Sequence, residues 1–188
     1  LDDVVGGHGD RGFRGHLRAL RHGRLTSGAL KLLVGVAVAT VATLTNEGIV
    51  TQLLRVVVIA GCANVFNLLD LAPGRATKTA VVAIVPALIV ERANEYLLVG
   101  QIMFVGAVLA LLPFEMREEV MQGDAGANAL GAVVGSAWVI ALAGSDAGLW
   151  AAAAVVVAIN VAGELTSFSR FIDRVPLLRA LDRLGRRP

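Results

Sequence analysis

Long apolar blocks separated by short polar stretches dominate the hydrophobic pattern of this chain. About 20 apolar residues carry a helix across the hydrocarbon core of a bilayer, so the blocks predict about six transmembrane helices. The third block is the weakest, since its apolar core runs only from Thr79 to Val90 and contains Pro86. The pattern predicts an all-α, polytopic membrane helical bundle with spans near residues 28–45, 50–70, 77–91, 97–114, 127–144 and 147–163.

Composition supports a membrane protein. Hydrophobic residues make up 56% of the 188 residues and charged residues only 17%, against about 45–50% and about 25% in soluble domains. A small soluble domain could not bury apolar blocks of this length. The single Cys62 excludes a disulfide framework, and no nucleic-acid partner is expected.

Basic residues indicate which side of the membrane each predicted loop faces. With six spans, all but two of the 17 Lys and Arg residues share one side, formed by the N-terminal segment, the loops at 71–76 and 115–126, and the tail. The exceptions are Arg92, in an opposite loop, and Arg55, which we expect to reach the outer interface from within a span. The positive-inside rule makes the basic side cytoplasmic. Removing the third span would divide the basic segments, so parity supports that span.

The C-terminal segment has a different pattern. Apolar residues such as Phe171, Leu177 and Leu181 alternate with Arg and Asp at near-helical spacing. This predicts an amphipathic helix lying on the inner leaflet, started or kinked by Pro176. We therefore divide the chain into a single transmembrane domain with cytoplasmic loops (1–163) and a cytoplasmic amphipathic tail (164–188).

Acidic and amide residues gather at the predicted cytoplasmic ends. The chain opens on Asp2-Asp3, and two adjacent carboxylates suit a Mg²⁺ ion that also binds substrate phosphates; a solvated helix end is the alternative. Asn64, Asn67 and Asp70 follow at spacing three, which places them on one stripe of a helix. Such a stripe lines a cleft open to the cytoplasm or forms interhelical hydrogen bonds.

Two further groups lie on the same side. Asp124 lies between Gly123 and Gly126 where a loop enters the fifth span, with Asn128 just beyond. Asp124 could be an N-cap, and the glycines could let a phosphate approach the backbone. A basic cluster near the N-terminus could bind a pyrophosphate or anionic lipid headgroups, or only set topology. It comprises Arg11, Arg14, His16, Arg18, Arg21, His22 and Arg24.

Taken in order, these motifs resemble the polyprenyl-phosphate N-acetylhexosamine-1-phosphate transferases, glycosyltransferase family 4. The chain is similar to phospho-N-acetylmuramoyl-pentapeptide transferase, a member of that family. The family pattern is Asp-Asp, Asn-x-x-Asn-x-x-Asp and Gly-Asp-x-Gly, each on a cytoplasmic loop. The matching positions are Asp2-Asp3, Asn64 to Asp70, and Gly123 to Gly126. The resemblance covers nearly the whole chain and implies further spans before Asp2.

The resemblance implies an Mg²⁺-dependent transfer of a phospho-N-acetylhexosamine from a UDP-sugar to a polyprenyl phosphate, with release of UMP. It places the enzyme in the bacterial plasma membrane, in peptidoglycan or other cell-envelope polysaccharide synthesis, and is compatible with a homodimer. The implied catalytic residues are Asp2, Asp3 and Asp70, and the implied metal ligands are Asp124 and Asp3. The implied substrate-binding residues are Asn64, Asn67, Arg11, Arg14, His16 and Asn128.

Two features of this chain depart from the family pattern. Many members have a second Asp where this chain has Pro73, and many carry a His-rich motif in the last cytoplasmic loop, where this chain has Glu164-Leu165-Thr166-Ser167. The alternatives to an active transferase are a truncated or degenerate homologue that acts as a membrane scaffold, and a transporter. A transporter is disfavoured because its polar residues would be expected near the bilayer midplane.

Overall fold

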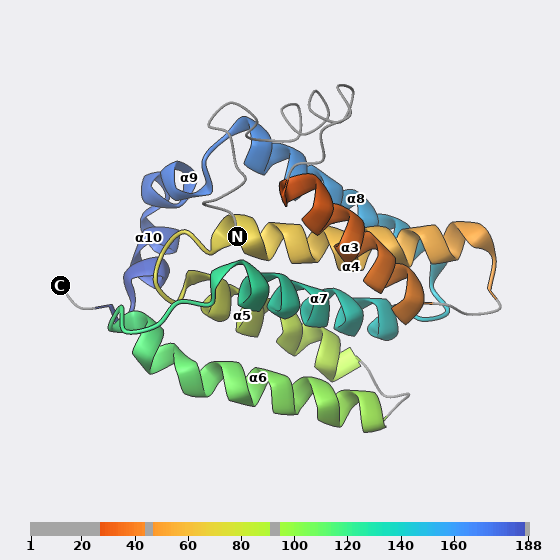
Figure 1. Cartoon of the computed structure of the whole chain (residues 1–188), viewed down its shortest axis with the longest axis horizontal. Helices are drawn as coiled ribbons and strands as arrows, with labels where there is room; N and C mark the ends of the chain where they lie inside the picture. Colours follow the sequence, from red (N-terminus) through yellow and green to blue (C-terminus); the bar gives the residue numbers. More distant parts are fainter. Residues whose placement is uncertain (1–26, 44–46, 91–94, 187–188) are drawn as a thin grey trace.

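The structure, a computed structural model, describes residues 27–43, 47–90 and 95–186 (Figure 1). In these ranges the chain forms helices and no strand, which confirms the all-α prediction. The helices run in the order α3 (Ser27–Ala42), α4 (Ile49–Leu69), α5 (Arg75–Val90), α6 (Glu95–Met116), α7 (Gly123–Ala141), α8 (Asp146–Leu165), α9 (Phe168–Arg174) and α10 (Pro176–Arg183).

Four of the described helices are long and apolar enough to cross a membrane: α4, α6 over Val99–Met116, α7 and α8. Helices α3 and α5 correspond to the first and third predicted spans, but each has 16 residues. At 1.5 Å per residue they are about 24 Å long, less than the roughly 30 Å of a hydrocarbon core. A polytopic helical membrane protein is therefore supported, while the count of six spans stays a prediction.

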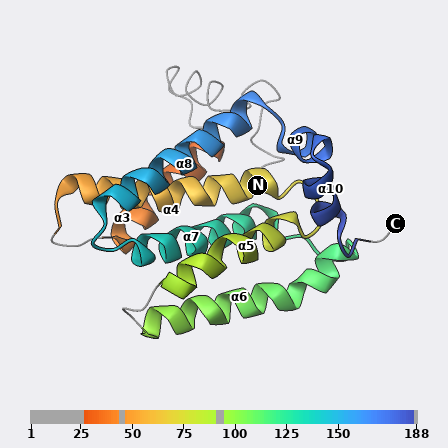
Figure 2. The same cartoon turned by 180° about the vertical axis from the view of Figure 1, so that it is seen from behind.

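Helix α4 lies at the centre of the bundle, with α7 and α8 packed along it and α6 outermost beside α5 (Figures 1 and 2). The contact between α4 and α7 depends on Gly131 and Gly135. A Cβ atom on Gly131 would lie 2.4 Å from the carbonyl oxygen of Cys62, and one on Gly135 would lie 2.8 Å from Cα of Ile59. Small residues at such a contact allow two membrane helices to approach closely. This close contact fixes α7, and hence its first turn, relative to α4.

Arg55 behaves partly as expected. Its side chain points toward the start of α4, but it is only 7% exposed and ends in an ion pair with Glu47, with 2.5 Å between Nη2 and Oε2. The sequence had predicted a cation that reaches the membrane interface. The structure instead pairs the charge within the protein, which reduces the penalty for burying it.

The tail folds as two short helices rather than the single amphipathic helix expected from the sequence. Helix α9 ends at Arg174, and Pro176 occupies the first turn of α10, where the missing N–H of proline removes no helical hydrogen bond. The prediction that Pro176 starts or kinks a helix is confirmed. Helices α9 and α10 lie across the ends of the longer helices (Figure 1).

Candidate functional site

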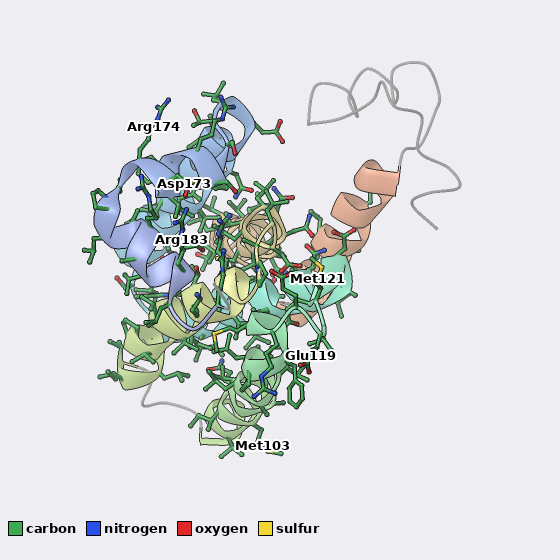
Figure 3. The ribbon with its side chains drawn as sticks, turned by 90° about the vertical axis from the view of Figure 1, so that its left-hand side faces the viewer. Met103, Glu119, Met121, Asp173, Arg174 and Arg183 are labelled. Carbon is green, nitrogen blue, oxygen red and sulfur yellow. The ribbon has the colours of Figure 1, made fainter. Side chains whose placement is uncertain are left out.

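The second and third sequence motifs meet at one end of the bundle, which we call the motif end. Helices α4 and α6 end there, α5 and α7 begin there, and the tail lies against it (Figure 1). Figure 3 looks onto this end, with the tail residues Asp173, Arg174 and Arg183 on one side and Glu119 and Met121 of the α6–α7 loop on the other. The candidate site is thus formed where four helices begin or end.

Asp70 and Asp124 are brought together by a backbone contact. Asp70 is the C-cap of α4, and its carboxylate accepts a hydrogen bond from the backbone N–H of Gly123 at the start of α7. Gly123 has a φ of +61°, a conformation that glycine adopts at little cost. Asp124 follows in the first turn of α7, close enough for its charge to act on Asp70. The structure therefore joins two motifs that lie more than 50 residues apart in the sequence.

The environment of Asp70 opposes its negative charge. Burial raises the pKa of the Asp70 carboxyl, and the charges of Glu115 and then Asp124 raise it further, against the lowering effect of the Gly123 N–H. A carboxylate held near two others favours a bound cation, which would relieve the repulsion. The electrostatics of the motif end thus suit a cation or a group that brings one.

The glycine motif at the start of α7 has a different local role from the expected one. The N-cap of α7 is Gln122, and Asp124 lies in the first turn, so the N-cap interpretation of Asp124 is wrong by two positions. A Cβ atom on Gly126 would lie 2.5 Å from Oε1 of Gln122, whereas one on Gly123 would meet nothing within 4 Å. Gly126 therefore makes room for the Gln122 side chain, and open space for a ligand remains only beside Gly123.

Asn128 reinforces this turn. Its Nδ2 donates to the backbone carbonyl of Asp124, with 2.6 Å between the two atoms. The structure thus places Asn128 one helical turn beyond Asp124 and directs one of its donors to the protein itself. Its predicted role in substrate binding stays a prediction.

The amide stripe on α4 is divided between two roles. Asn64 donates from Nδ2 to Oδ1 of Asn160 on α8 at 2.7 Å, and Asn160 donates in turn to the carbonyls of Gly61 and Val156. This is the interhelical hydrogen bonding that was the alternative reading of the stripe. Asn160 was missed in the sequence, although a lone amide inside an apolar block was an available signal.

Asn67 differs from Asn64. Its Oδ1 atom is buried and accepts no hydrogen bond from the described residues. A buried acceptor without a donor costs about 1–3 kcal/mol. Since Asn67 lies one turn before Asp70, this unsatisfied acceptor lies close to the motif end.

Glu115 is a further acidic residue that the sequence reasoning missed. It lies in the last turn of α6, is 3% exposed, and accepts a hydrogen bond from the Thr77 hydroxyl at 2.7 Å. Gln122 donates to the same hydroxyl at 3.3 Å. The signal was a charged residue at the end of an apolar block. Through Thr77, Glu115 is linked to the residue that caps α7 and precedes Gly123.

The described residues would hold Mg²⁺ only if a substrate supplied part of its coordination. Among the described residues, no three His, Cys, Asp or Glu side chains are grouped closely enough to hold a metal ion by themselves. The repulsion between Asp70, Glu115 and Asp124 acts over longer distances than coordination does. Mg²⁺ is commonly held by one or two carboxylates together with substrate phosphates, and Asp70 and Asp124 offer two carboxylates.

The remaining predicted site residues lie outside the described part of the chain. They are Asp2, Asp3, Arg11, Arg14 and His16. Their predicted roles in positioning a lipid phosphate, binding a metal and binding a pyrophosphate stay predictions.

Comparison with known proteins identifies a family. The model of "Glycosyl transferase family 4" matches residues 19–143. This range contains Asn64 to Asp70 and Gly123 to Gly126, the motifs that the structure brings together, and it begins after Asp2-Asp3. No curated protein and no solved structure matches the chain.

Proposed function

Because this chain belongs to glycosyl transferase family 4, we propose that it transfers a phospho-N-acetylhexosamine from a UDP-sugar to a polyprenyl phosphate and releases UMP. Family membership and the four apolar helices make it a membrane glycosyl-1-phosphate transferase acting on lipid-linked substrates. The donor, the polyprenyl acceptor, Mg²⁺ and a role in the bacterial cell envelope belong to the proposal. So does an orientation with the motif end facing the cytoplasm.

The observation that carries the proposal is the contact between the end of α4 and the start of α7. It places the carboxylates of Asp70 and Asp124 at one bundle end, beside an uncrowded glycine turn. Family 4 chemistry requires a water-soluble nucleotide and a lipid phosphate to meet at a membrane surface. A site at the end of the helices, rather than halfway along them, meets this requirement.

The proposed reaction exchanges one phosphoanhydride for another. An oxygen of the polyprenyl phosphate attacks the β-phosphorus of the UDP-sugar, and the bond from that phosphorus to the bridging oxygen breaks. UMP leaves with the bridging oxygen, and the lipid keeps a pyrophosphoryl sugar. The attacking phosphate is already ionised at neutral pH, so a strong general base is not required.

Each site residue has a proposed task in this reaction. Asp124 and Asp70 would hold Mg²⁺, which when bound neutralises charge on the diphosphate and on the departing UMP. Asn67 would accept a hydrogen bond from the donor substrate, because its Oδ1 is the buried acceptor of the stripe. Asp2 and Asp3 would position the lipid phosphate, with Asp3 also near the metal.

The first experiment measures UMP release by the protein in proteoliposomes that contain undecaprenyl phosphate and Mg²⁺. UDP-N-acetylglucosamine and UDP-N-acetylmuramoyl-pentapeptide are the two donors. We expect release with one donor, and a loss of about 100-fold or more for Asp124→Asn, in the range caused by removing a group that stabilises transition-state charge.

Asp146→Asn is the matched control, because Asp146 also lies in the first turn of an apolar helix, α8, but at the opposite end of the bundle (Figure 1). It should retain the wild-type rate within about twofold, as expected for a surface charge away from the site. Equal losses in both variants would contradict the role of Asp124. Absence of release with either donor would overturn the proposed donor class.

A further inference from the structure

The turn after Asp70 is held by a buried arginine. Arg75, the first residue of α5, is 6% exposed. Its Nε and Nη2 donate to the two carboxylate oxygens of Asp182 in α10, at 2.8 and 3.1 Å, and its Nη1 donates to the Ser169 hydroxyl of α9 at 2.8 Å. Two parallel hydrogen bonds between a guanidinium and a carboxylate form the geometrically most specific kind of ion pair.

A second guanidinium joins the same carboxylate. Arg186 donates from Nη2 to Asp182 at 2.8 Å and from Nε to the carbonyl oxygen of Pro73 at 3.0 Å. Lys78 adds three hydrogen bonds to the carbonyls of Leu181, Asp182 and Leu184, where α10 ends. Asp182 therefore connects the tail to the turn at two points, directly at Arg75 and through Arg186 at Pro73.

The turn itself is short and is fixed at its other end. Asp70 closes α4 through a hydrogen bond from its backbone N–H to the carbonyl of Phe66, and its carboxylate is bound by the N–H of Gly123. Only four residues lie between Asp70 and Arg75. Because so few residues lie between these two points, a displacement of Arg75 or Pro73 is transmitted to Asp70.

Arg75 is not free to bind a phosphate in this arrangement. Each of its three nitrogens already donates to a tail side chain, and the pair is almost completely shielded from solvent, with side-chain exposures of 8% and 9%. Spacing alone, with Arg75 three residues before the basic Lys78, would suit a phosphate site. Its contacts assign it to the tail instead.

We propose that Asp182 is a positioning residue: through Arg75 and Arg186 it fixes the turn that carries Asp70, so that the tail is part of the catalytic assembly. The inference deepens the proposed function and rests on it, since Asp70 matters only if the motif end binds the metal and nucleotide. It goes beyond that function by assigning a role to a segment in which no family motif was found. Misplacement of a catalytic group by about 1 Å can reduce a rate about 100-fold.

The test compares Asp182→Asn, Arg75→Gln, the double variant and Asp173→Asn. Asp173 is the matched control, because it is also a tail aspartate paired with an arginine, Arg183, but at 3.9 Å and in an exposed position. We expect Asp182→Asn and Arg75→Gln each to lower UMP release about 10- to 100-fold. The double variant should lose no more than the worse single variant, since both changes remove one shared interaction. Asp173→Asn should stay within about twofold.

Two readouts separate positioning from general loss of folding. The first is the Mg²⁺ concentration that gives half the maximal rate, which should rise several-fold in Asp182→Asn, whereas a merely smaller folded fraction would lower the rate at every Mg²⁺ concentration. The second is independent of activity: trypsin should cut after the tail arginines about tenfold faster in Asp182→Asn, because release of α10 lets its helical backbone unfold locally into a form that the protease can bind. Additive losses in the double variant, or unchanged half-saturation and unchanged cleavage, would overturn the positioning role.

The proteolysis result also distinguishes the two proposals. If the wild-type protein releases no UMP while Asp182→Asn is cut faster than Asp173→Asn, the proposed reaction fails and the attachment of the tail stands. If UMP is released equally by wild-type and Asp182→Asn protein, the reaction stands and the positioning role fails.

Discussion

At the scale of single residues, Asp70 shows how far function and stability conflict at the motif end. Its carboxylate is needed in the proposed site, yet burial and the nearby charges of Glu115 and Asp124 raise its pKa. An acid whose pKa is raised by folding loses folding stability as the pH rises from its ordinary value, 3.8, through the raised pKa. Without metal, the Asp70 carboxyl therefore leaves the fold less stable at neutral pH than in acid.

Asp70→Asn should accordingly raise the thermal midpoint of the detergent-purified protein at pH 7 in EDTA, by on the order of 1 °C because the group is partly solvated. The amide oxygen can still accept from Gly123, and the repulsion is removed. Below the ordinary aspartate pKa the difference should vanish, since the wild-type carboxyl is then protonated both folded and unfolded. Thermal scans between pH 3 and 8 measure this, and a lower midpoint for Asp70→Asn at pH 7 would show that the charge stabilises the fold.

Single residues also show what could be predicted from sequence. Spacing three identified Asn64, Asn67 and Asp70 as one stripe, because helical periodicity is local. Periodicity could not tell that Asn64 is bound by Asn160, or that Glu115 approaches Asp70. Those partners come from other helices, and their identity depends on how the helices pack.

At the scale of helices, the contact between α4 and α7 decides whether the two motifs meet. Gly131 and Gly135 lie one helical turn apart on α7, against the backbone of α4. The apolar blocks predicted α4 to within one residue at each end, whereas α7 begins four residues and ends three residues before the predicted span. Which helices would be neighbours did not follow from the blocks, because an apolar surface packs equally well on lipid or on another helix.

Gly131→Ala tests this contact. The added Cβ would lie 2.4 Å from the carbonyl oxygen of Cys62, so the helices must separate, at a cost of about 1–3 kcal/mol or a thermal midpoint lower by about 3–10 °C. UMP release should fall as well, since Asp124 moves with α7. Gly106→Ala on α6 is the control: it meets nothing within 4 Å, and alanine favours a helix interior over glycine by about 1 kcal/mol, so its midpoint should be unchanged or higher. Equal midpoints for the two variants would mean that α4 and α7 can accept a Cβ atom at position 131 without separating.

At the scale of the whole molecule, hydrophobic pattern and charge predicted a helical membrane bundle, which the helices of the structure confirm, and an amphipathic tail, which folds as two short helices. They did not predict that ion pairs between side chains attach the tail to the bundle. Arg75 and Asp182 are 107 residues apart, and either could as well have been a solvated surface charge. Only the folded arrangement, with the tail across the ends of the helices (Figure 1), makes them partners.

The attachment of the tail should resist acid well below neutral pH. Burial alone would raise the pKa of Asp182, but the Arg75 hydrogen bonds and the charges of Arg75, Arg186 and Lys78 outweigh it and lower the pKa. A carboxyl with a lowered folded pKa contributes stability above its ordinary value, 3.8, and loses it as the pH falls through the lowered pKa. A spin label at Ala180→Cys should keep constant mobility from pH 7 to about pH 4 and become more mobile only in stronger acid. Release between pH 5 and 6 would contradict a dominant role for Asp182.

The sequence separation of 107 residues between Arg75 and Asp182 also has a consequence for the order in which the protein is made. A ribosome adding about 5–20 residues per second makes Asp182 about 5–20 s after Arg75. During that interval the helices from α6 to α8 are made while the arginine at the start of α5 has no carboxylate from the tail. The nascent protein therefore passes through a stage in which these helices exist but the turn beside Asp70 is not yet held by the ion pair with Asp182. Synthesis of the tail, rather than of the helices that precede it, would complete the site.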